Sequence, residues 1–263
     1  MTFSIIIATM NGEKHLARAL DSIAVQTWKD REVIMQDGGS TDGTAAVAAR
    51  YGDMVDWRSE PDSGVYDAWN RAVARMRGDW ALFLGADDFL LEPDILERGV
   101  ALLRELPAHT AFAYGDLLLG RDGRPRLRLM RSLRAVYTLM QNTMGLPFPS
   151  TFVKGTLLRG QPFDASYRIA GDFDFAARTM TAGNVARLPL TVTFMEEGGI
   201  SGSDKWEKQL REERERVLRS RVLPRSEEYV RGCIEYMDEK ACCYSRKKIK
   251  PGFFGRLRGL VRG

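Results

Sequence analysis

The stretch Glu32–Thr44, EVIMQDGGSTDGT, joins an apolar strand to a glycine turn and to the start of a helix. The run Glu32–Gln36 has the length and composition of a buried strand, and the two glycines after Asp37 allow the backbone to turn sharply. Ser40 or Thr41 can cap the helix that follows. A strand–loop–helix unit of this kind, when repeated, predicts an α/β fold with a mostly parallel central sheet and helices on both faces.

The same unit recurs on both sides of this stretch. We expect strands at Phe3–Ala8, Glu32–Gln36, Val55–Ser59 and Trp80–Leu84, and helices at Glu13–Gln26, Thr41–Tyr51 and Val65–Arg77. In such sheets, ligands bind beyond the carboxyl ends of the strands, where polar loops meet helix N-termini. The residues that directly follow the strands are therefore the first candidates for a functional site.

Past residue 90 the pattern is less regular. Pro93 begins an expected helix, and the apolar run Ala111–Leu119 is followed by a turn at Arg121–Pro125. The next expected elements are a strand, a helix and a strand, at Ser150–Val153, Gly171–Thr181 and Val185–Thr193. Two highly charged helices, broken near Pro224, come last. The chain therefore divides into a main domain at 1–202, with halves at 1–90 and 91–202, a charged helical extension at 203–248 and a basic tail at 249–263.

The composition is that of a globular protein with a sizeable core. Apolar residues make up 44% and charged residues 28% of the 263 positions, which excludes a disordered or fibrous chain. The three cysteines all fall after residue 232, which fits a reducing cytosol better than a disulfide framework. No apolar stretch has the character of a membrane span or a signal peptide. We therefore expect a cytoplasmic protein.

Two adjacent carboxylates, Asp87 and Asp88, directly follow the apolar run Trp80–Leu84. Their placement costs desolvation and mutual repulsion unless a cation or hydrogen-bond donors compensate. A divalent ion, Mg²⁺ or Mn²⁺, that is held by one or two carboxylates while it binds substrate phosphates is one explanation. The alternative is a pair that caps the helix at Pro93. The neighbouring strand end at Asp37 favours the ion.

A second polar cluster lies in Glu60–Arg71, EPDSGVYDAWNR. Asp62 precedes an expected helix start, and Asp67 shares one helix face with residues three and four positions later. A structural interpretation, in which Asp67 pairs with Arg71 beside buried aromatic side chains, accounts for only part of this polar set.

Two more carboxylates, Asp172 and Asp174, open a later helix in the segment AGDFDF. A carboxylate at a helix N-terminus in a cleft suits a general base, and it can equally serve as a cap alone. For Asp37 too, two interpretations stand: it accepts hydrogen bonds from a ligand, or it only shapes the turn.

Taken in order, five of these segments resemble the family 2 glycosyltransferases with the GT-A fold, in particular bacterial members that build surface polysaccharides, O-antigens and exopolysaccharides. The likeness covers roughly residues 1–200. It implies inverting, metal-dependent transfer of a single sugar from a nucleotide-diphosphate donor, expected to be a UDP-sugar, to a glycan or lipid-linked acceptor. The segments that carry it are FSIIIATMN (Phe3–Asn11), DGGSTDGT (Asp37–Thr44), EPDSGVYDAWN (Glu60–Asn70), GDWALFLGADD (Gly78–Asp88) and AGDFDF (Ala170–Phe175).

The resemblance also implies roles for single residues, and it makes 1–90 the nucleotide-sugar half and 91–202 the acceptor half. Thr9 and Asn11 would belong to the donor nucleotide pocket, and Asp37 would recognise the base. The donor cleft would further be lined by Asp62 and by the helix start at Asp67, Asn70 and Arg71.

The implied metal site is the family's DXD-type motif, with Asp88 as the direct ligand of Mn²⁺ or Mg²⁺ and Asp87 nearer the ribose. Gly85 stands where many members carry a further Asp, which makes the metal site thinner. Asp172 aligns with the second position of the family's Glu-Asp motif, whose first position is here Gly171. It is therefore the candidate base, although Asp174 stays open as an alternative.

Two other functions stay open. A sugar-phosphate nucleotidyltransferase would share the sheet and the metal, but the glycine-rich basic loop expected after its first strand is absent from ATMNGEKH, Ala8–His15. A catalytically silent GT-A-like binding scaffold is the second, and Gly85 and Gly171 are its best support. Metal-dependent hydrolysis of a nucleotide-sugar would separate a silent scaffold from an enzyme.

The formal net charge of +4 comes from an excess of basic residues near the end of the sequence. Residues 246–263, RKKIKPGFFGRLRGLVRG, hold seven basic residues and no acid, so the other 245 residues carry 32 basic against 35 acidic, or −3. Apolar side chains alternate with arginines there, a pattern suited to an anionic inner-leaflet surface, although a disordered basic tail is an alternative. We expect peripheral association with the inner face of the cytoplasmic membrane and no nucleic-acid partner.

One more basic stretch, Arg121–Arg134, has six arginines and one acid. It either contacts the diphosphate of an acceptor or is a solvated hairpin. The expected acceptor is a lipid-linked oligosaccharide. The sequence leaves the sugar, the linkage and the oligomeric state open.

Overall fold

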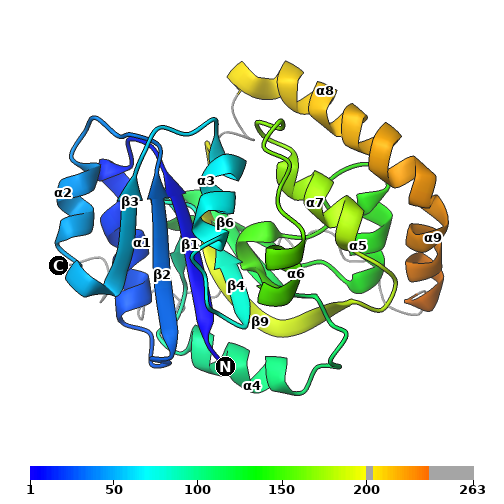
Figure 1. Ribbon diagram of the computed structural model, residues 1–263. Helices are drawn as coiled ribbons and strands as arrows, with labels where there is room; N and C mark the ends of the chain where they lie inside the picture. The colour runs from blue at the N-terminus through cyan, green and yellow to red at the C-terminus, as the bar shows by residue number, and fades with distance from the viewer. Residues whose placement is uncertain (200–203, 237–263) are drawn as a thin grey trace.

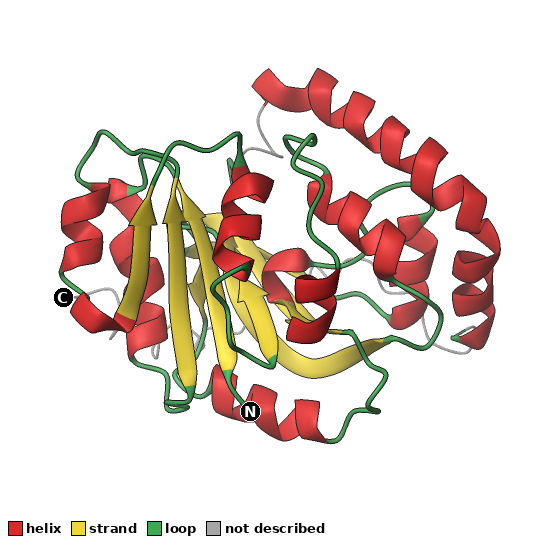
Figure 2. Ribbon diagram, viewed as in Figure 1, coloured by secondary structure: helices red, strands yellow, loops and turns green. Residues whose placement is uncertain are grey.

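The computed structural model describes residues 1–199 and 204–236. A nine-stranded sheet runs through the centre (Figures 1 and 2) in the order β3-β2-β1-β4-β8-β6-β9-β5, and β7 pairs with β6. The strands are β1 (Phe3–Thr9), β2 (Arg31–Asp37), β3 (Val55–Ser59), β4 (Trp80–Phe83), β5 (Phe89–Leu90), β6 (Phe112–Arg121), β7 (Arg124–Leu129), β8 (Thr151–Lys154) and β9 (Val185–Glu196).

The first four strands along this order are parallel, as the repeated strand–loop–helix unit predicted. The register places Thr9 opposite Asp37, so the carboxyl ends of β1 and β2 lie side by side. Beyond β4 the sheet is mixed, because β8 pairs antiparallel with both β4 and β6. The central sheet therefore joins a parallel half to a half built around β6 and β9, which are parallel to each other.

Helices cover both faces of the sheet because its central strands are apolar on both sides. On β1, Ile5 and Ile7 pack with α1, α2 and α4, while Ile6 packs with α3, α5 and α7 on the other face. The helices are α1 (Glu13–Ala24), α2 (Thr44–Ala49), α3 (Val65–Val73), α4 (Ile95–Arg104), α5 (Leu133–Met140), α6 (Gly155–Gly160), α7 (Gly171–Thr179), α8 (Glu207–Val217) and α9 (Ser226–Glu235).

One departure from the predicted elements is at α2, which starts at Thr44 rather than Thr41. The residues before it are held in a loop by side chains of the β1–α1 segment: Thr41 N–H donates to Asn11 Oδ1 at 3.0 Å and Gly43 N–H donates to Glu13 Oε2 at 3.0 Å. Their backbone donors are thus used across the sheet edge instead of within the helix.

The turn after β6 is a two-residue hairpin loop. Asp122 and Gly123 have φ angles of 52° and 71°, and Arg121 pairs with Arg124 across the loop. Positive φ at both central residues is the requirement of the tight hairpin turns that favour Asp-Gly. The predicted turn at Arg121–Pro125 is confirmed, and β7 runs back along β6.

The C-terminal helices α8 and α9 pack against the main body. They are joined by tighter and looser helical turns at Leu218–Arg225 around Pro224, near the predicted break. Val217, Val222 and Tyr229 belong to the same buried cluster as α3, α5 and α7. In the described part of the chain, no helix is long and apolar enough to cross a membrane.

Candidate active site

The predicted nucleotide pocket residues lie together at the carboxyl ends of β1 and β2. Asp37 is buried, and it accepts hydrogen bonds from Ser40 N–H at 2.9 Å and Ser59 Oγ at 2.6 Å. Asn11, with φ of 55°, donates its backbone N–H to Ser40 Oγ at 2.7 Å. Thr9 keeps a buried hydroxyl without a hydrogen-bond partner among the described residues. The structure therefore brings these three side chains together around one loop, and their role in nucleotide binding stays a prediction.

Asp62 lies across from the same loop. A Cβ atom on Gly38 would meet Asp62 Oδ2 at 2.8 Å, so Gly38 is needed for the close approach of the two loops. Asp62 Oδ1 accepts Gly64 N–H at 2.9 Å. Burial is the main cause of the raised pKa of Asp62. A partly desolvated carboxylate thus stands beside Asp37, where the donor cleft was predicted.

The polar residues of α3 are largely occupied by neighbouring protein groups. Arg71 binds Asp67 at 2.9 Å and also Glu60 at 3.3 Å. Asn70 makes two hydrogen bonds with the backbone of Phe163, at 2.8 and 2.9 Å. These contacts hold the 60–64 loop and the 163 segment against α3. They agree with the structural interpretation of the Asp67–Arg71 pair and extend it to Asn70.

Asp87 and Asp88 follow β4 in a tight turn. Asp88 is 5% exposed, and it accepts Glu196 N–H at 3.0 Å and Gly85 N–H at 3.3 Å. Burial, together with the charge of Asp87, raises the pKa of Asp88 to about 7. A Cβ atom on Gly85 would lie 2.7 Å from Asp88 Oδ2 and 2.8 Å from Asp87 Oδ1. The absence of a side chain at Gly85 therefore lets both carboxylates lie close to its Cα atom. No side chain fits at position 85 in this conformation.

This carboxylate pair fits a cation that takes most of its other ligands from a substrate. Among residues 1–199 and 204–236, no group of three or more His, Cys, Asp or Glu side chains is arranged to hold a metal. Mg²⁺ is commonly bound through one or two carboxylates plus substrate phosphates. Burial and the nearby charge of Asp87 raise the pKa of Asp88 because both disfavour its ionised form. A positive charge between the two carboxylates would compensate for this cost.

Two charged residues that the sequence analysis missed support this turn. Arg18 of α1 donates from Nη2 to the Asp87 carbonyl oxygen at 2.7 Å and to Glu196 Oε2 at 2.7 Å. The Glu196 carboxylate also accepts the backbone N–H groups of Asp122 and Gly123 in the hairpin loop. Arg18 and Glu196 are 178 positions apart in the chain, so no local motif links them. The network connects the donor-side turn to the β6–β7 hairpin.

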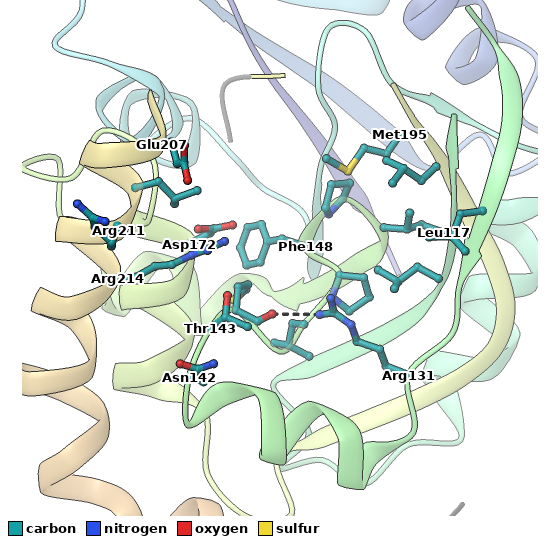
Figure 3. A pocket seen from close by; sticks show the side chains of 18 of the residues that line it. Leu117, Arg131, Asn142, Thr143, Phe148, Asp172, Met195, Glu207, Arg211 and Arg214 are labelled. Carbon is teal, nitrogen blue, oxygen red and sulfur yellow. Dashed lines mark hydrogen bonds between the residues drawn. The ribbon is translucent and has the colours of Figure 1, made fainter. Parts of the chain in front are cut away.

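A cavity of about 850 Å³ lies between the β6–β7 hairpin, the 142–149 loop and α8, and Asp172 is part of its lining. Figure 3 shows Asp172 at the α8 side of this cavity, next to Arg214, with Leu117 and Met195 on the opposite side. Met195 directly precedes Glu196, whose N–H binds Asp88. Met195, on the wall opposite Asp172, is therefore one position along β9 from the backbone group that binds Asp88.

Asp172 is held at the start of α7. It accepts Phe173 N–H at 2.7 Å and lies 3.3 Å from the Tyr66 hydroxyl, which donates to Ile169 O at 2.5 Å. Burial raises the pKa of Asp172 to about 6, against the opposing effects of its hydrogen bonds and of Arg214. The Tyr66 ring also explains Gly171, where a Cβ atom would meet it at 2.7 Å.

Asp174, the other candidate, points elsewhere. It is completely buried, and it binds Arg178 at 2.7 Å and Arg221 at 2.8 Å. A carboxylate that is shared by two guanidinium groups is a structural ion pair and is not available to a substrate. Of the two acids that the sequence left open, only Asp172 lines the cavity.

The loop before Asp172 is fastened by α8. The carboxylate of Glu213 is 8% exposed and accepts three successive backbone N–H groups, from Arg168 at 2.9 Å, Ile169 at 2.8 Å and Ala170 at 2.9 Å. The sequence analysis missed Glu213 because it is one of many charged residues in α8. Its burial and its partners exist only after α8 has packed on the body.

Comparison with known proteins assigns the family. Residues 4–159 match the family described as "Glycosyl transferase family 2". The chain belongs to glycosyl transferase family 2. A PGL/p-HBAD biosynthesis glycosyltransferase of Mycobacterium tuberculosis is 33% identical over 218 residues, which cover 76% of this chain and 79% of the relative. The resemblance inferred from the five sequence segments is thus confirmed at the level of the family.

Solved structures agree on the fold. One similar structure is Staphylococcus aureus TarS in complex with UDP-GlcNAc, with a TM-score of 0.61, 21% identity and coverage of 77% of this chain and 60% of that chain. Another is glucosyl-3-phosphoglycerate synthase from Mycobacterium tuberculosis, in complex with Mn²⁺, UDP-glucose and phosphoglyceric acid, with a TM-score of 0.55, 20% identity and coverage of 80% of this chain and 76% of that chain. The family 2 chain therefore has the expected GT-A fold.

The basic stretch of this family 2 protein is mostly engaged in ion pairs. Arg128 binds the buried Asp116 at 2.7 Å, and Arg126 binds Glu197 at 3.0 Å. Arg131 lines the cavity and donates to the Met144 carbonyl oxygen at 3.1 Å. The stretch forms the turn and return strand of the β6–β7 hairpin, and Arg131 is a member that reaches the cavity. Contact of this stretch with an acceptor diphosphate stays a prediction. The tail at 249–263 lies outside the described residues.

Proposed function

We propose that this family 2 glycosyltransferase transfers a single sugar, with inversion, from a nucleotide-diphosphate sugar to a hydroxyl of a glycan or lipid-linked acceptor. The observation that carries the proposal is the position of Asp172. It is a carboxylate with a pKa of about 6 at the wall of a cavity of about 850 Å³, and the opposite wall includes Met195, the neighbour of the residue that binds Asp88. Asp172 and the carboxylate pair Asp87 and Asp88 divide the roles of acceptor activation and donor binding between them.

On the donor side, Thr9, Asn11 and Asp37 would bind the nucleotide, with the free Thr9 hydroxyl and the Asp37 carboxylate as hydrogen-bonding groups. A UDP-sugar is the proposed donor. The cleft would be completed by Asp62 and by the α3 start at Asp67, Asn70 and Arg71, whose present contacts keep the cleft wall in place.

Asp88 and Asp87 would hold a divalent cation, Mn²⁺ or Mg²⁺, together with the diphosphate. When bound, the cation would neutralise the charge that grows on the leaving diphosphate. The protein's own contribution at this point is to keep the two carboxylates oriented, through Gly85 N–H and Glu196 N–H on Asp88. Because these donors come from the backbone, the orientation does not depend on flexible side chains.

On the acceptor side, Asp172 would accept the proton of the attacking hydroxyl. The hydroxyl oxygen then forms a bond to the anomeric carbon on the face opposite the diphosphate, and the bond between that carbon and the diphosphate oxygen breaks. A base with a pKa near 6 is largely ionised at neutral pH and still basic enough to share a proton in the transition state. The acceptor half would thus activate the hydroxyl that attacks the sugar bound by the donor half.

The first test is a binding and product assay with purified protein. UDP-sugars and GDP-sugars are titrated by calorimetry with and without Mn²⁺, and the products of a reaction with a cell-envelope lipid extract are weighed by mass spectrometry. We expect cation-dependent binding of one donor class and a product heavier by one sugar. Absence of nucleotide-sugar binding would overturn the proposal. If added pyrophosphate is instead consumed to form a nucleoside triphosphate and a sugar 1-phosphate, the enzyme is a nucleotidyltransferase. Donor binding without any turnover would indicate a silent scaffold.

We also propose that the basic tail, residues 249–263, brings the enzyme to an anionic membrane surface where a lipid-linked oligosaccharide would be bound. Support comes from the sequence pattern of arginines among apolar residues. The test is co-sedimentation of the full chain and of a chain ending at residue 248 with vesicles that contain anionic lipid. Equal binding of the two proteins would exclude this role of the tail.

A further inference from the structure

The β6–β7 hairpin presents an apolar wall to the cavity. Leu117 pairs with Leu129 and Leu119 pairs with Leu127 across the two strands, so the four leucines share one face. All four line the cavity. Arg126 and Arg128, the alternate residues of β7, instead bind Glu197 and Asp116. The sequence RPRLRL thus divides β7 into a leucine face and an arginine face.

The opposite side of the cavity continues this apolar surface. Leu146 and Phe148 belong to the loop before β8, and Leu210 and Leu218 come from the C-terminal helices. Twelve of the twenty described lining residues are apolar. A sugar offers hydroxyl groups that need hydrogen-bonding partners when they lose water, and leucine walls supply none. The leucine face of this cavity is therefore unsuited to a glycan chain.

The polar lining residues include Asp172, Arg214, Asn142 and Thr143, which Figure 3 shows on the side away from Leu117. A molecule that presents a hydroxyl to Asp172 must place its adjacent atoms inside the same cavity. The hydroxyl would then meet polar groups, and the part behind it would meet the leucine wall. The cavity is built for a molecule with one polar end and an apolar body.

We propose that the acceptor carries an apolar alkyl group close to the hydroxyl that receives the sugar, and that the leucine wall binds this group. The inference rests on the proposed function, since it takes Asp172 as the base. It narrows the acceptor from any glycan or lipid-linked molecule to one whose apolar part enters the active site. The enzyme would accordingly act near the alkyl end of its acceptor, not at the far end of a long glycan.

The test compares the binding of n-octyl glucoside and methyl glucoside, which differ only in the apolar group. Both are titrated below the micelle-forming concentration, with UDP and Mn²⁺ present, and followed by ligand-observed NMR. Octyl glucoside is expected to bind at least about tenfold more tightly, since each buried methylene favours binding. Equal binding of the two glucosides would overturn the inference.

The double variant Leu127→Asn/Leu129→Asn is expected to abolish this preference, and Leu127→Met/Leu129→Met to keep it. Arg126→Gln, on the other face of the same strand, is the matched control that should leave the preference unchanged. A thermal melt of each protein reports whether it is folded. A folded Asn variant that retains the full octyl preference would show that the leucine wall is not the binding surface.

Binding of UDP-sugar to the same proteins separates the two levels of inference. Normal nucleotide-sugar binding with no octyl preference would remove the apolar acceptor and leave the proposed function standing. Absence of nucleotide-sugar binding by the wild-type protein would contradict the proposed function itself.

Discussion

At the scale of single residues, two acids that are only two positions apart have different surroundings. Asp172 faces the cavity, whereas Asp174 is buried between Arg178 and Arg221. The same residue type in the same helical turn thus serves two purposes, because successive positions of a helix point in different directions.

We expect Asp172→Asn to reduce transfer by about 100- to 10,000-fold, since it removes the proposed base and keeps the shape of the side chain. Donor affinity should remain within about twofold, because none of the proposed donor residues lines the cavity that Asp172 faces. The measurement is kcat with calorimetric donor binding. Normal turnover of this variant would rule out Asp172 as the base.

Asp174→Asn is the contrasting change. It should lower the free energy of unfolding by about 1–3 kcal/mol, because it leaves two guanidinium groups without their shared carboxylate. Chemical denaturation measures this loss. If Asp174→Asn instead left stability unchanged and abolished turnover, the roles of the two acids would be reversed.

The pKa of Asp172 predicts a pH dependence. The carboxylate must be ionised to accept a proton, so kcat should rise with pH through about 6 and level off above it. Arg214 lowers this pKa, and Arg214→Gln should therefore move the acidic limb to higher pH. Arg216→Gln is the control, since Arg216 pairs with Asp164 instead. An unchanged limb in Arg214→Gln would contradict this electrostatic role.

At the scale of elements, α8 acts as a clamp on the loop before α7. Glu213→Gln replaces a carboxylate that accepts three N–H groups by an amide with one oxygen, so the loop loses part of its support. We expect kcat to fall at least about tenfold, with the KM for donor unchanged. Glu212→Gln, an exposed neighbour that pairs only with Lys208, should have no effect. A fall in donor affinity alone would argue against this positioning role.

On the donor side, Arg18 joins α1 to the turn that carries the carboxylate pair. Arg18→Gln removes the hydrogen bonds to Asp87 O and Glu196, so the turn should become less well ordered. The expected result is about tenfold weaker Mn²⁺-dependent binding of UDP, which calorimetry reports without any turnover. Arg77→Gln, a surface change, serves as the control. Unaltered binding in Arg18→Gln would mean that the backbone alone maintains this turn.

At the scale of the whole molecule, the C-terminal helices are part of the folded body. Val217, Val222 and Tyr229 are each at most 3% exposed and pack in the core cluster of α5 and α7. A chain ending at residue 202 should therefore be poorly soluble or melt at a clearly lower temperature, because it would expose this apolar surface. A chain ending at 236 should melt like the full chain. A stable, active 1–202 fragment would show that the main domain is independent.

Much of the fold could be predicted from the sequence because its signals are local. Apolar runs that end in Asp37 or Asp88 each contain a strand and the loop after it within about ten residues, so the pattern itself places both carboxylates at the sheet edge. The same holds for the five motifs that indicated the family. The ends of helices were predicted less accurately. The residues before α2, for example, donate hydrogen bonds to the side chains of Asn11 and Glu13 in the β1–α1 segment.

The sequence by itself determined the parallel half of the sheet and the family, and it placed Asp37 and Asp88 after the ends of strands. Only the tertiary structure separated Asp172 from Asp174, joined Arg18 to Glu196, and showed Glu213 beneath the loop of α7. The physical reason is that hydrogen bonding and burial between distant segments depend on packing, which no spacing along the chain encodes. The cavity beside the leucine wall also depends on packing between distant segments, because it forms only when α8 lies opposite the hairpin.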